Sequence, residues 1–213
     1  MAKGRRRPSR ERATAPDARG MEMAVREFLR AAGVETEGTE LEETPARVAE
    51  TWISILLDGY QADAASILAE TYPVPDGPKG TVLLKSIPFH GLCPHHLLPY
   101  HGRAHLAYVP GNKLASLSSL GRLVDAYAHR LEIQETVTRQ IADALTEHLG
   151  AEGAAVALET DQLCMTLRHP ERKGTRTVTQ HFTGAFALES GLRLEFLKSL
   201  EAFGGSPPSL TQG

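Results

Sequence analysis

The chain has 213 residues, of which 41% are hydrophobic, and its formal net charge is −3. This length and apolar content are enough for one sizeable core, so we expect a single main domain. The small net charge argues against a general nucleic-acid binder, and no apolar run approaches the roughly 20 residues needed to cross a bilayer. We therefore expect neither a nucleic acid nor a membrane as partner.

Basic residues are concentrated at the start of the chain, where they are Lys3, Arg5, Arg6, Arg7, Arg10 and Arg12. Few apolar residues accompany them, which is typical of a disordered, solvated arm. We expect a tail over 1–20, one domain over 21–203 and a loose end over 204–213. A contact of the tail with nucleic acid or a membrane is the less favoured alternative. The start lacks the apolar segment of a secretory signal and only two cysteines occur, so we expect a cytoplasmic protein.

Two helices are expected before the first long strand. Apolar residues from Met23 to Ala32 recur at helical spacing, and Gly33 ends this stripe. Thr44 is a suitable N-cap, and Pro45 would then occupy the first helical position. We expect this second helix to end near Gly59.

The middle of the chain predicts two strands followed by two long helices. The strands are expected over 81–87 and 102–109, and turn-forming residues follow the second one. Apolar residues spaced by three and four then predict helices over 117–131 and 133–145.

Two further strands, over 154–168 and 175–186, are expected around a polar turn, and a last short helix over 192–202. Adjacent pairs of strands favour antiparallel hairpins, so the fold class is α+β. We expect one antiparallel sheet of two hairpins with the two long helices on one face, plus the N-terminal helices. Such a sheet has open edges that need cover or a neighbouring subunit, which favours an oligomer.

The segment Cys93-Pro94-His95-His96 has the strongest chemical signal. Zinc prefers thiolate and imidazole ligands, and a C-x-x-H spacing can place Cys93 and His96 on one ion. Cys164 is the only other thiol. A Cys2His set leaves a fourth position for water, which is typical of a catalytic zinc rather than a structural one. Alternatively, both cysteines are small buried apolar residues and both histidines are ordinary loop residues.

Cys164 is predicted to lie on the strand over 154–168. If the odd-numbered residues 163–167 face the core, the opposite face is shared by Gln162, Cys164, Thr166 and Arg168. Such a row would suit an anionic substrate beside a metal. The apolar residues before position 160 have the other parity, and a bulge near Thr160 would reconcile the two.

Other polar residues are suited to a purine nucleotide. Glu135 follows Gln134 at the start of the second long helix, and such a pair can bind the edge of a guanine. Alternatively, Glu135 is a solvated residue that is favourable to the helix dipole. Arg47, Arg122 and Arg168 can clamp phosphates through charge-assisted hydrogen bonds, or they can pair with surface carboxylates.

Together these segments resemble the GTP cyclohydrolase I family. The resemblance covers roughly residues 44–186, and the motifs agree in order and spacing. They are Thr44-Pro45-x-Arg47, Cys93-x-His95-His96, Leu117-Ser118, Arg130-x-x-x-Gln134-Glu135, Cys164-Met165-x-x-Arg168, Thr177-Val178-Thr179 and Gly184-x-Phe186.

The resemblance implies the tunnelling fold (T-fold), in which the sheets of several subunits combine into a barrel, and a homodecamer with active sites shared between subunits. It also implies a zinc cofactor and GTP or a related purine nucleotide as substrate. In the implied reaction, water activated by zinc attacks C8 of GTP, the imidazole ring opens and formate leaves. The ribose then rearranges and closes onto the base, giving 7,8-dihydroneopterin triphosphate for pterin or folate biosynthesis.

The resemblance also implies roles for single residues. The zinc ligands would be Cys93, His96 and Cys164, and the acid/base residue would be His95. Guanine would contact Gln134 and Glu135. The ribose and triphosphate would contact Ser118, Arg122 and Arg168, with Arg47 supplied by a neighbouring subunit.

The sequence departs from the family pattern at four positions near the expected site. Gln162 stands where the family has a second catalytic histidine, and an amide cannot relay protons at neutral pH. Loss of one proton-transfer group typically slows a reaction by roughly 10²- to 10⁴-fold. The other departures are Pro94, Ser119 and His169, which replace glutamate, lysine and glycine.

His181 is a candidate substitute for the missing histidine. If the last hairpin is centred between Arg168 and Thr175, His181 lies opposite Gln162 and on the same face. A register slip of one residue would send it to the other face.

Three functions stay open at this point. The first is a complete GTP cyclohydrolase I. The second is an altered enzyme that stops at a ring-opened or deformylated intermediate, or that uses another purine nucleotide, such as one with fewer phosphates. The third is a non-catalytic relative that binds a nucleotide or pterin, or that assembles with a true cyclohydrolase.

Overall fold

The structure is a computed structural model that describes residues 14–201. The chain divides into two compact units, Met1–Ala62 and Asp63–Gly213. Most of the predicted basic tail and the predicted loose C-terminal end lie outside the described residues. None of the helices within 14–201 is long and apolar enough to cross a bilayer.

Two helices form the described part of the first unit. α1 (Ala18–Ala31) begins after Asp17, whose carboxylate accepts a hydrogen bond from the Gly20 N–H, and Gly33 follows it with a φ of 78°. α2 (Thr44–Thr51) continues into the π-helix η1 (Trp52–Leu56), and the 3-10 turn η2 (Asp58–Tyr60) comes next. The helical pattern predicted from the sequence is confirmed here.

The predicted cap of α2 is wrong. Thr44 is the first helical residue, and Glu43 precedes it with no hydrogen bond from a capping side chain. Pro45 still lies in the first turn, where its missing N–H would have no partner within the helix.

The second unit is built on a four-stranded antiparallel sheet in the order β2-β3-β5-β6. Its strands are β2 (Val82–Leu92), β3 (Pro99–Val109), β5 (Gly153–Gln162) and β6 (Thr177–Thr183). The short helix α3 (Ala64–Ile67) precedes β1 (Thr71–Pro73), which pairs with β4 (Lys113–Ala115) in a separate ladder. The α+β class and the antiparallel pairing of both predicted hairpins are confirmed.

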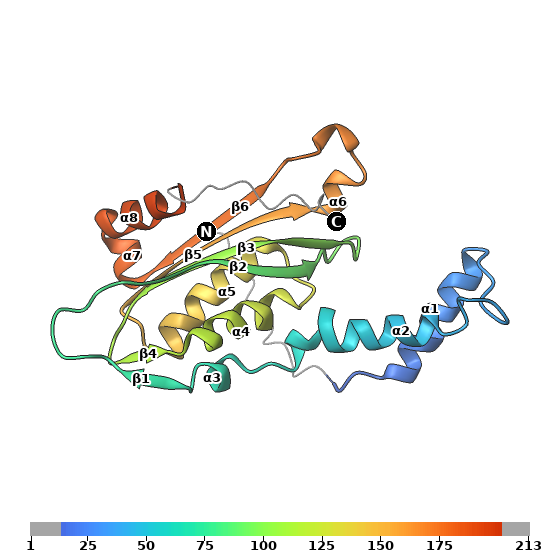
Figure 1. The fold of residues 1–213 in the computed structure, drawn as a ribbon, viewed down its shortest axis with the longest axis horizontal. Helices are drawn as coiled ribbons and strands as arrows, with labels where there is room; N and C mark the ends of the chain where they lie inside the picture. The colour runs from blue at the N-terminus through green and yellow to red at the C-terminus, as the bar shows by residue number, and fades with distance from the viewer. Residues whose placement is uncertain (1–13, 202–213) are drawn as a thin grey trace, which may run out of the picture. The chain divides into compact units, whose positions relative to one another are not determined.

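The main core lies between one face of this sheet and two long helices, α4 (Leu117–Ala128) and α5 (Gln134–Glu147) (Figure 1). Alternate residues of the central strands point into it, namely Leu106, Tyr108, Val156 and Leu158. Apolar side chains from both helices fill the other side, including Leu120, Leu123, Val137 and Ile141. Two long helices on one face were predicted, and the structure confirms them.

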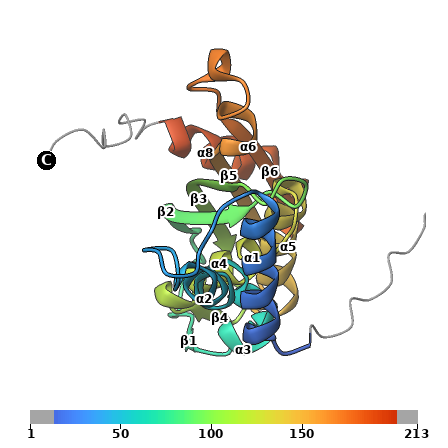
Figure 2. The same ribbon diagram turned by 90° about the vertical axis from the view of Figure 1, so that its right-hand side faces the viewer.

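The helices α7 (Gly184–Leu188) and α8 (Ser190–Glu201) lie over the opposite face (Figure 1), and Figure 2 shows α8 on the side of the sheet away from α4. A smaller core lies beneath them. The sheet offers small side chains there, Ala107, Ala155 and Ala157. Phe186 and Phe196 fill the space above these alanines, with ring centroids 6.3 Å apart in an edge-to-face arrangement. This second layer of helices covers a face that the sequence pattern left open.

The predicted strand over 154–168 ends early, because β5 stops at Gln162 and a one-turn helix, α6 (Leu163–Thr166), follows. Gln162 pairs with Tyr100 of β3, and the next residue of β3 is Pro99, which has no N–H to donate. The pairing of β3 with β5 shows no register shift, so the predicted bulge near Thr160 is wrong.

The predicted partner of His181 is also wrong. His181 pairs with Val156, and the pairing of β5 with β6 ends where Thr160 meets Thr177. The connection from 161 to 176 contains α6 and the 3-10 turn η3 (Pro170–Arg172), so the hairpin is centred about three residues earlier than expected. His181 therefore lies six residues along the sheet from Gln162, or about 20 Å.

Candidate metal centre

The turn between β2 and β3 carries two of the three predicted metal ligands. The Leu97 N–H donates to the Cys93 carbonyl at 2.8 Å, and the Cys93 N–H donates to the Leu98 carbonyl at 2.9 Å. Leu97 has a φ of 55°, a left-handed conformation that turns the chain back into β3. The turn buries Cys93 and leaves the imidazoles of His95 and His96 exposed.

Three predicted ligands converge at this turn. The ligand atoms of Cys93, His96 and Cys164 all lie within 4.8 Å of one another. The Cys93 Sγ is 3.6 Å from the His96 Nδ1. Zn–S and Zn–N bonds of about 2.3 and 2.0–2.1 Å at a tetrahedral angle would place sulfur and nitrogen about 3.6 Å apart. Donor set and spacing therefore fit a metal ion such as zinc with three protein ligands.

Cys164 reaches this cluster from α6 rather than from a strand. The predicted row of side chains from Gln162 to Arg168 on one strand face is therefore wrong, because a helical turn rotates each residue relative to the last. Both cysteines are free thiols. Partial burial raises the pKa of the Cys164 thiol, and the neighbouring Cys93 raises it further. A cation that displaces the thiol protons would remove this unfavourable contact between two potential anions.

Two further side chains border the cluster. The His95 Nδ1 is 3.9 Å from the Cys93 Sγ, so the predicted acid/base residue lies beside the ligands. The Arg168 Nη1 is 2.7 Å from the His96 Nε2. A guanidinium only donates, so the Nε2 of His96 is the acceptor in this contact. Arg168 is exposed, and its guanidinium contacts a predicted ligand rather than an acidic partner.

Gln134 lies inside the protein, although it was predicted to contact guanine. Its side chain is only 4% exposed, and its amide bonds to groups on β5 and β6. In this arrangement Gln134 ties the first turn of α5 to the sheet. Glu135, the next residue, is exposed and available to an external ligand.

Gln162 is adjacent to this buried amide. Its Nε2 donates to the Gln134 Oε1 at 2.8 Å, and its Oε1 lies 3.9 Å from the Cys164 Sγ. His181, the predicted substitute for the missing imidazole, is instead 3.7 Å from the Asp143 carboxylate of α5. The structure therefore brings Gln162 to the cluster and leaves His181 away from it.

The predicted phosphate-binding residues of the second unit lie at the start of α4. Ser118 is exposed, and its hydroxyl is 3.0 Å from that of Ser116, the N-cap of the helix. Arg122 donates to the Ser119 hydroxyl at 3.1 Å and to the Glu70 carboxylate at 3.3 Å. Ser119 is fully buried, so the residue that replaces the lysine of the family pattern bonds inward.

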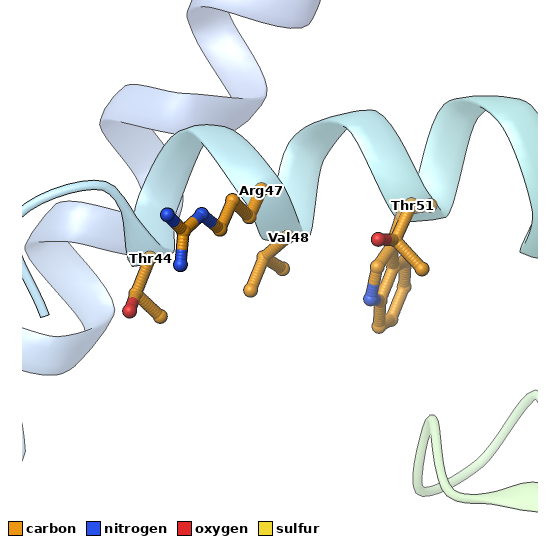
Figure 3. A pocket seen from close by; sticks show the side chains of 5 residues that line it. Thr44, Arg47, Val48 and Thr51 are labelled. Atoms are coloured by element: carbon orange, nitrogen blue, oxygen red, sulfur yellow. The ribbon is translucent and has the colours of Figure 1, made fainter.

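Arg47 belongs to the first unit, where it pairs with Glu43 one turn earlier. It lines a shallow hollow along α2 together with Thr44, Val48, Thr51 and Trp52. Figure 3 shows Arg47, Val48 and Thr51 along one side of the helix. The side chain is exposed, as a residue that serves a neighbouring subunit would need to be.

One pattern in the sequence indicates that the Gln134 amide is buried, and it was overlooked in the prediction. Thr177 and Thr179 alternate on β6 on the face that covers the core, and Thr138 follows Gln134 by one helical turn. Polar residues at core-facing positions usually satisfy a buried polar partner. That pattern indicates an internal Gln134 side chain rather than one that faces a ligand.

Comparison with known proteins points in a single direction. A family model described as GTP cyclohydrolase I matches residues 21–201. The chain is 40% identical over 190 residues to GTP cyclohydrolase 1 of Ralstonia nicotianae, with 89% of this chain and 90% of that protein covered. It is 39% identical to the same enzyme of Chromobacterium violaceum, with 90% and 92% covered. For the enzyme of Deinococcus radiodurans the identity is 37%, with 85% and 83% covered.

Among solved structures, the archaeosine synthase QueF-Like in its apo form matches with a TM-score of 0.43 and 15% identity. The match covers 51% of this chain and 97% of that one. This likeness is too weak to define the fold.

Proposed function

Because this chain belongs to the GTP cyclohydrolase I family, we propose that it hydrolyses the purine ring of GTP at C8, releases formate and forms 7,8-dihydroneopterin triphosphate. Family membership makes it a hydrolase of this type. The observation that carries the proposal is the convergence of Cys93, His96 and Cys164.

Cys93, His96 and Cys164 would hold the metal. A bound zinc ion lowers the pKa of a coordinated water to about 7, which supplies a nucleophile near neutral pH. Three protein ligands leave the fourth position open for it. The two cysteines must lose their protons to ligate. Arg168 is exposed, and the N–H groups of its guanidinium that do not contact His96 can bind a phosphate.

His95 is the proposed acid/base residue. Imidazole is the side chain best suited to proton transfer near neutral pH, and that of His95 is exposed at the mouth of the cluster, 3.9 Å from the Cys93 sulfur. Gln162 cannot share this task, because an amide does not titrate in this range. The ring opening and the later rearrangement would therefore depend on His95.

Glu135 is the proposed contact for guanine, since its exposed carboxylate can accept hydrogen bonds from the ring N–H and the exocyclic amine. Ser118, Arg122 and Arg168 would contact the ribose and triphosphate, with Arg47 from a neighbouring subunit. Gln134 would support this site from within rather than touch the base.

We propose that the protein assembles as a homodecamer whose sheets form a barrel. β2 and β6 are the edges of the sheet, and they expose apolar side chains, Leu83 at 40% and Val178 at 55%. None of the α1 residues is buried within the described chain, and Phe28 is 71% exposed. A neighbouring subunit would cover these surfaces. We place the enzyme in the cytoplasm, where it would supply pterin or folate biosynthesis.

Gln162 favours a second candidate function. Without a second imidazole, the reaction can stop at the ring-opened or deformylated intermediate, or proceed on a different purine nucleotide. Product identity separates the candidates. We expect zinc-loaded protein and GTP to give formate and a product with the mass of dihydroneopterin triphosphate, fluorescent after oxidation.

A change in the purine ultraviolet band without pterin fluorescence would favour the altered enzyme. Nucleotide binding without any change in mass would favour a non-catalytic relative. The matched control is Cys164→Ala, which removes one proposed ligand and should abolish every mass change.

A further inference from the structure

A chain of buried and partly buried hydrogen bonds runs from the first turn of α5 to the metal cluster. Gln134 and Thr160 lie in the interior, at 4% and 0% exposure, and Gln162 is half-buried beside them. Thr160 donates to the Gln134 Oε1 at 2.6 Å, and the Gln162 Nε2 contacts the same oxygen at 2.8 Å. Two amide side chains therefore meet end to end just behind Cys164.

The surroundings of Gln134 fix which end of its amide points where. Its Nε2 lies 3.0 Å from the Leu158 carbonyl and 3.2 Å from the Thr177 carbonyl. Backbone carbonyls only accept, so the NH2 group must face them. The oxygen of Gln134 must then face Gln162. A flip of this amide would set oxygen against two carbonyls, which buried polar groups do not tolerate.

Gln162 is fixed in turn. Because the Gln134 oxygen only accepts, the end of Gln162 that meets it must be the NH2 group, whose second hydrogen can reach the Thr160 hydroxyl at 3.0 Å. The carbonyl oxygen of Gln162 is left at the other end, 3.9 Å from the Cys164 Sγ. The hydrogen bonds thus determine that an acceptor, and not a donor, faces the cluster.

We propose that Gln162 is a positioning residue: Gln134 and Thr160 lock its amide, and its carbonyl oxygen orients the protonated Cys164 thiol before a metal binds and then offers a fixed acceptor to the ligand beside the metal. The proposal deepens the proposed function and rests on it in one respect, namely that Cys93, His96 and Cys164 bind a metal. An imidazole here could keep an N–H toward Gln134 and present a nitrogen that gains and loses a proton. The amide oxygen only accepts.

The acceptor has a consequence for what the site holds. When Cys164 ligates as a thiolate it no longer has a proton to donate. The Gln162 oxygen is then open to an O–H or N–H of the water or substrate at the fourth position. Gln162 would orient that donor without exchanging a proton with it.

The test measures the affinity for cobalt(II), which reports its coordination by visible absorption, in the absence of nucleotide. We expect Gln162→Met and Gln134→Met each to weaken cobalt binding by about tenfold and to shift the cobalt–thiolate bands. The double variant should weaken it by no more than about threefold beyond either single variant, because both changes break one chain. Gln162→His keeps an N–H for Gln134 and should stay within about threefold of the wild type.

Thr146→Val is the matched control. It removes a partly buried bond between α5 and β6, that of the Thr146 and Thr183 hydroxyls at 2.7 Å, near the opposite end of the sheet. It should lower resistance to urea without changing cobalt affinity or spectrum. If Gln134→Met does not fold, the comparison of Gln162→Met with Gln162→His still decides.

Wild-type cobalt affinity and spectrum in Gln162→Met would overturn the positioning role while leaving the proposed function intact. A wild-type protein that binds neither cobalt nor zinc would contradict the proposed function itself, and this proposal with it.

Discussion

The two ends of the β2-β3-β5-β6 sheet are closed by different means. Where β5 runs into α6, side chains meet: two thiols, the His96 imidazole and the linked amides of Gln134 and Gln162. At the other end, backbone meets backbone. Gly153 forms a bridge with Gly184, and the Ala185 N–H donates to the Glu152 carbonyl at 3.0 Å.

The two ends of the sheet therefore differ in what their residues control: metal binding at one end and folding stability at the other. His95, His96 and Arg168 are exposed at the metal end, so they can be replaced with little loss of packing. A Cβ added to Gly184 would lie only 2.0 Å from the Glu152 carbonyl oxygen, so the glycine end leaves no room for change. We expect substitutions at the metal end to alter metal affinity and product, and those at the glycine end to alter stability alone.

The largest effect is expected from Cys164→Ala. Loss of one of three ligands should weaken metal binding by at least about 100-fold and abolish pterin formation. Because the side chain is only half-buried, the free energy of unfolding of the metal-free protein should change by less than about 1 kcal/mol. Metal competition and urea unfolding with a chelator present measure the two quantities. Wild-type metal affinity in this variant would remove the basis of the comparison.

The next largest effect is expected from Gly184→Ala. Gly184 has a φ of 49°, and the new Cβ would clash with backbone atoms of Glu152 and Gly153. The free energy of unfolding should therefore fall by about 3 kcal/mol. Metal affinity of the folded protein should stay unchanged. Gly191→Ala is the control, because a Cβ there meets nothing within 4 Å and it lies in α8. Equal urea midpoints for the two variants would contradict the prediction.

Leu97→Asn tests whether the ligand turn holds avoidable strain. Left-handed backbone disfavours a leucine by roughly 1–2 kcal/mol and tolerates asparagine better, and Leu97 is 46% exposed. We expect the free energy of unfolding to rise by about 0.5–1 kcal/mol. Metal affinity should stay within about threefold of the wild type, because both hydrogen bonds that close the turn are between backbone groups. Leu97→Ala lacks a polar side chain that can hydrogen-bond to the local backbone, so it should show no gain. A loss of stability in the asparagine variant would show that the leucine packs better than its exposure indicates.

The smallest effect is expected at His105, which lies on the α8 side of β3, away from the metal end. Burial lowers the pKa of His105, the charges of Lys85 and Arg103 favour the same direction, and Glu159 opposes them. The Ser86 N–H also faces its Nδ1, at 3.4 Å. The imidazole has a pKa of about 6.5 in the unfolded chain, so in acid the unfolded chain binds more protons than the folded protein.

Above about pH 6.5 His105 is neutral in both states and does not reduce the free energy of unfolding. As the pH falls from there toward the lower pKa of the folded state, the unfolded chain takes up the proton first and the protein loses stability. Urea midpoints of the metal-free protein at about pH 7.5 and 5.5 measure this loss. His105→Gln should reduce the difference between the two midpoints, whereas an unchanged difference would assign the acid loss to other groups.

Local patterns in the sequence predicted the elements but not their long-range partners. Apolar spacing located α4 and α5 because each buries one stripe against a sheet. The ligands Cys93 and Cys164 were identifiable because the chain has only two thiols. The end of β5 was missed because Leu163, Met165 and Leu167 alternate as in a strand, while the ladder actually ends at Pro99 of another strand.

The strand partner of His181 and the direction of the Gln134 side chain were mispredicted for related reasons. The partner of His181 depends on how many residues the connection between β5 and β6 consumes, and polar residues such as those of η3 give no measure of that length. A glutamine at a helix start can point outward or inward. The Gln134 side chain points inward because it bonds to threonines of β6 such as Thr179, which is more than 40 positions away in the sequence.

The Cys93–His96 turn and Cys164 are separated by roughly 70 residues of chain, so a metal held between them would act as a removable cross-link. Closing a loop of that length by a covalent bond restricts the unfolded chain by about 4 kcal/mol in the simplest entropy model. A chelator would remove this cross-link without breaking any hydrogen bond of the sheet. Metal content would then set the melting temperature of the second unit, and the enzyme would lose heat resistance together with its cofactor.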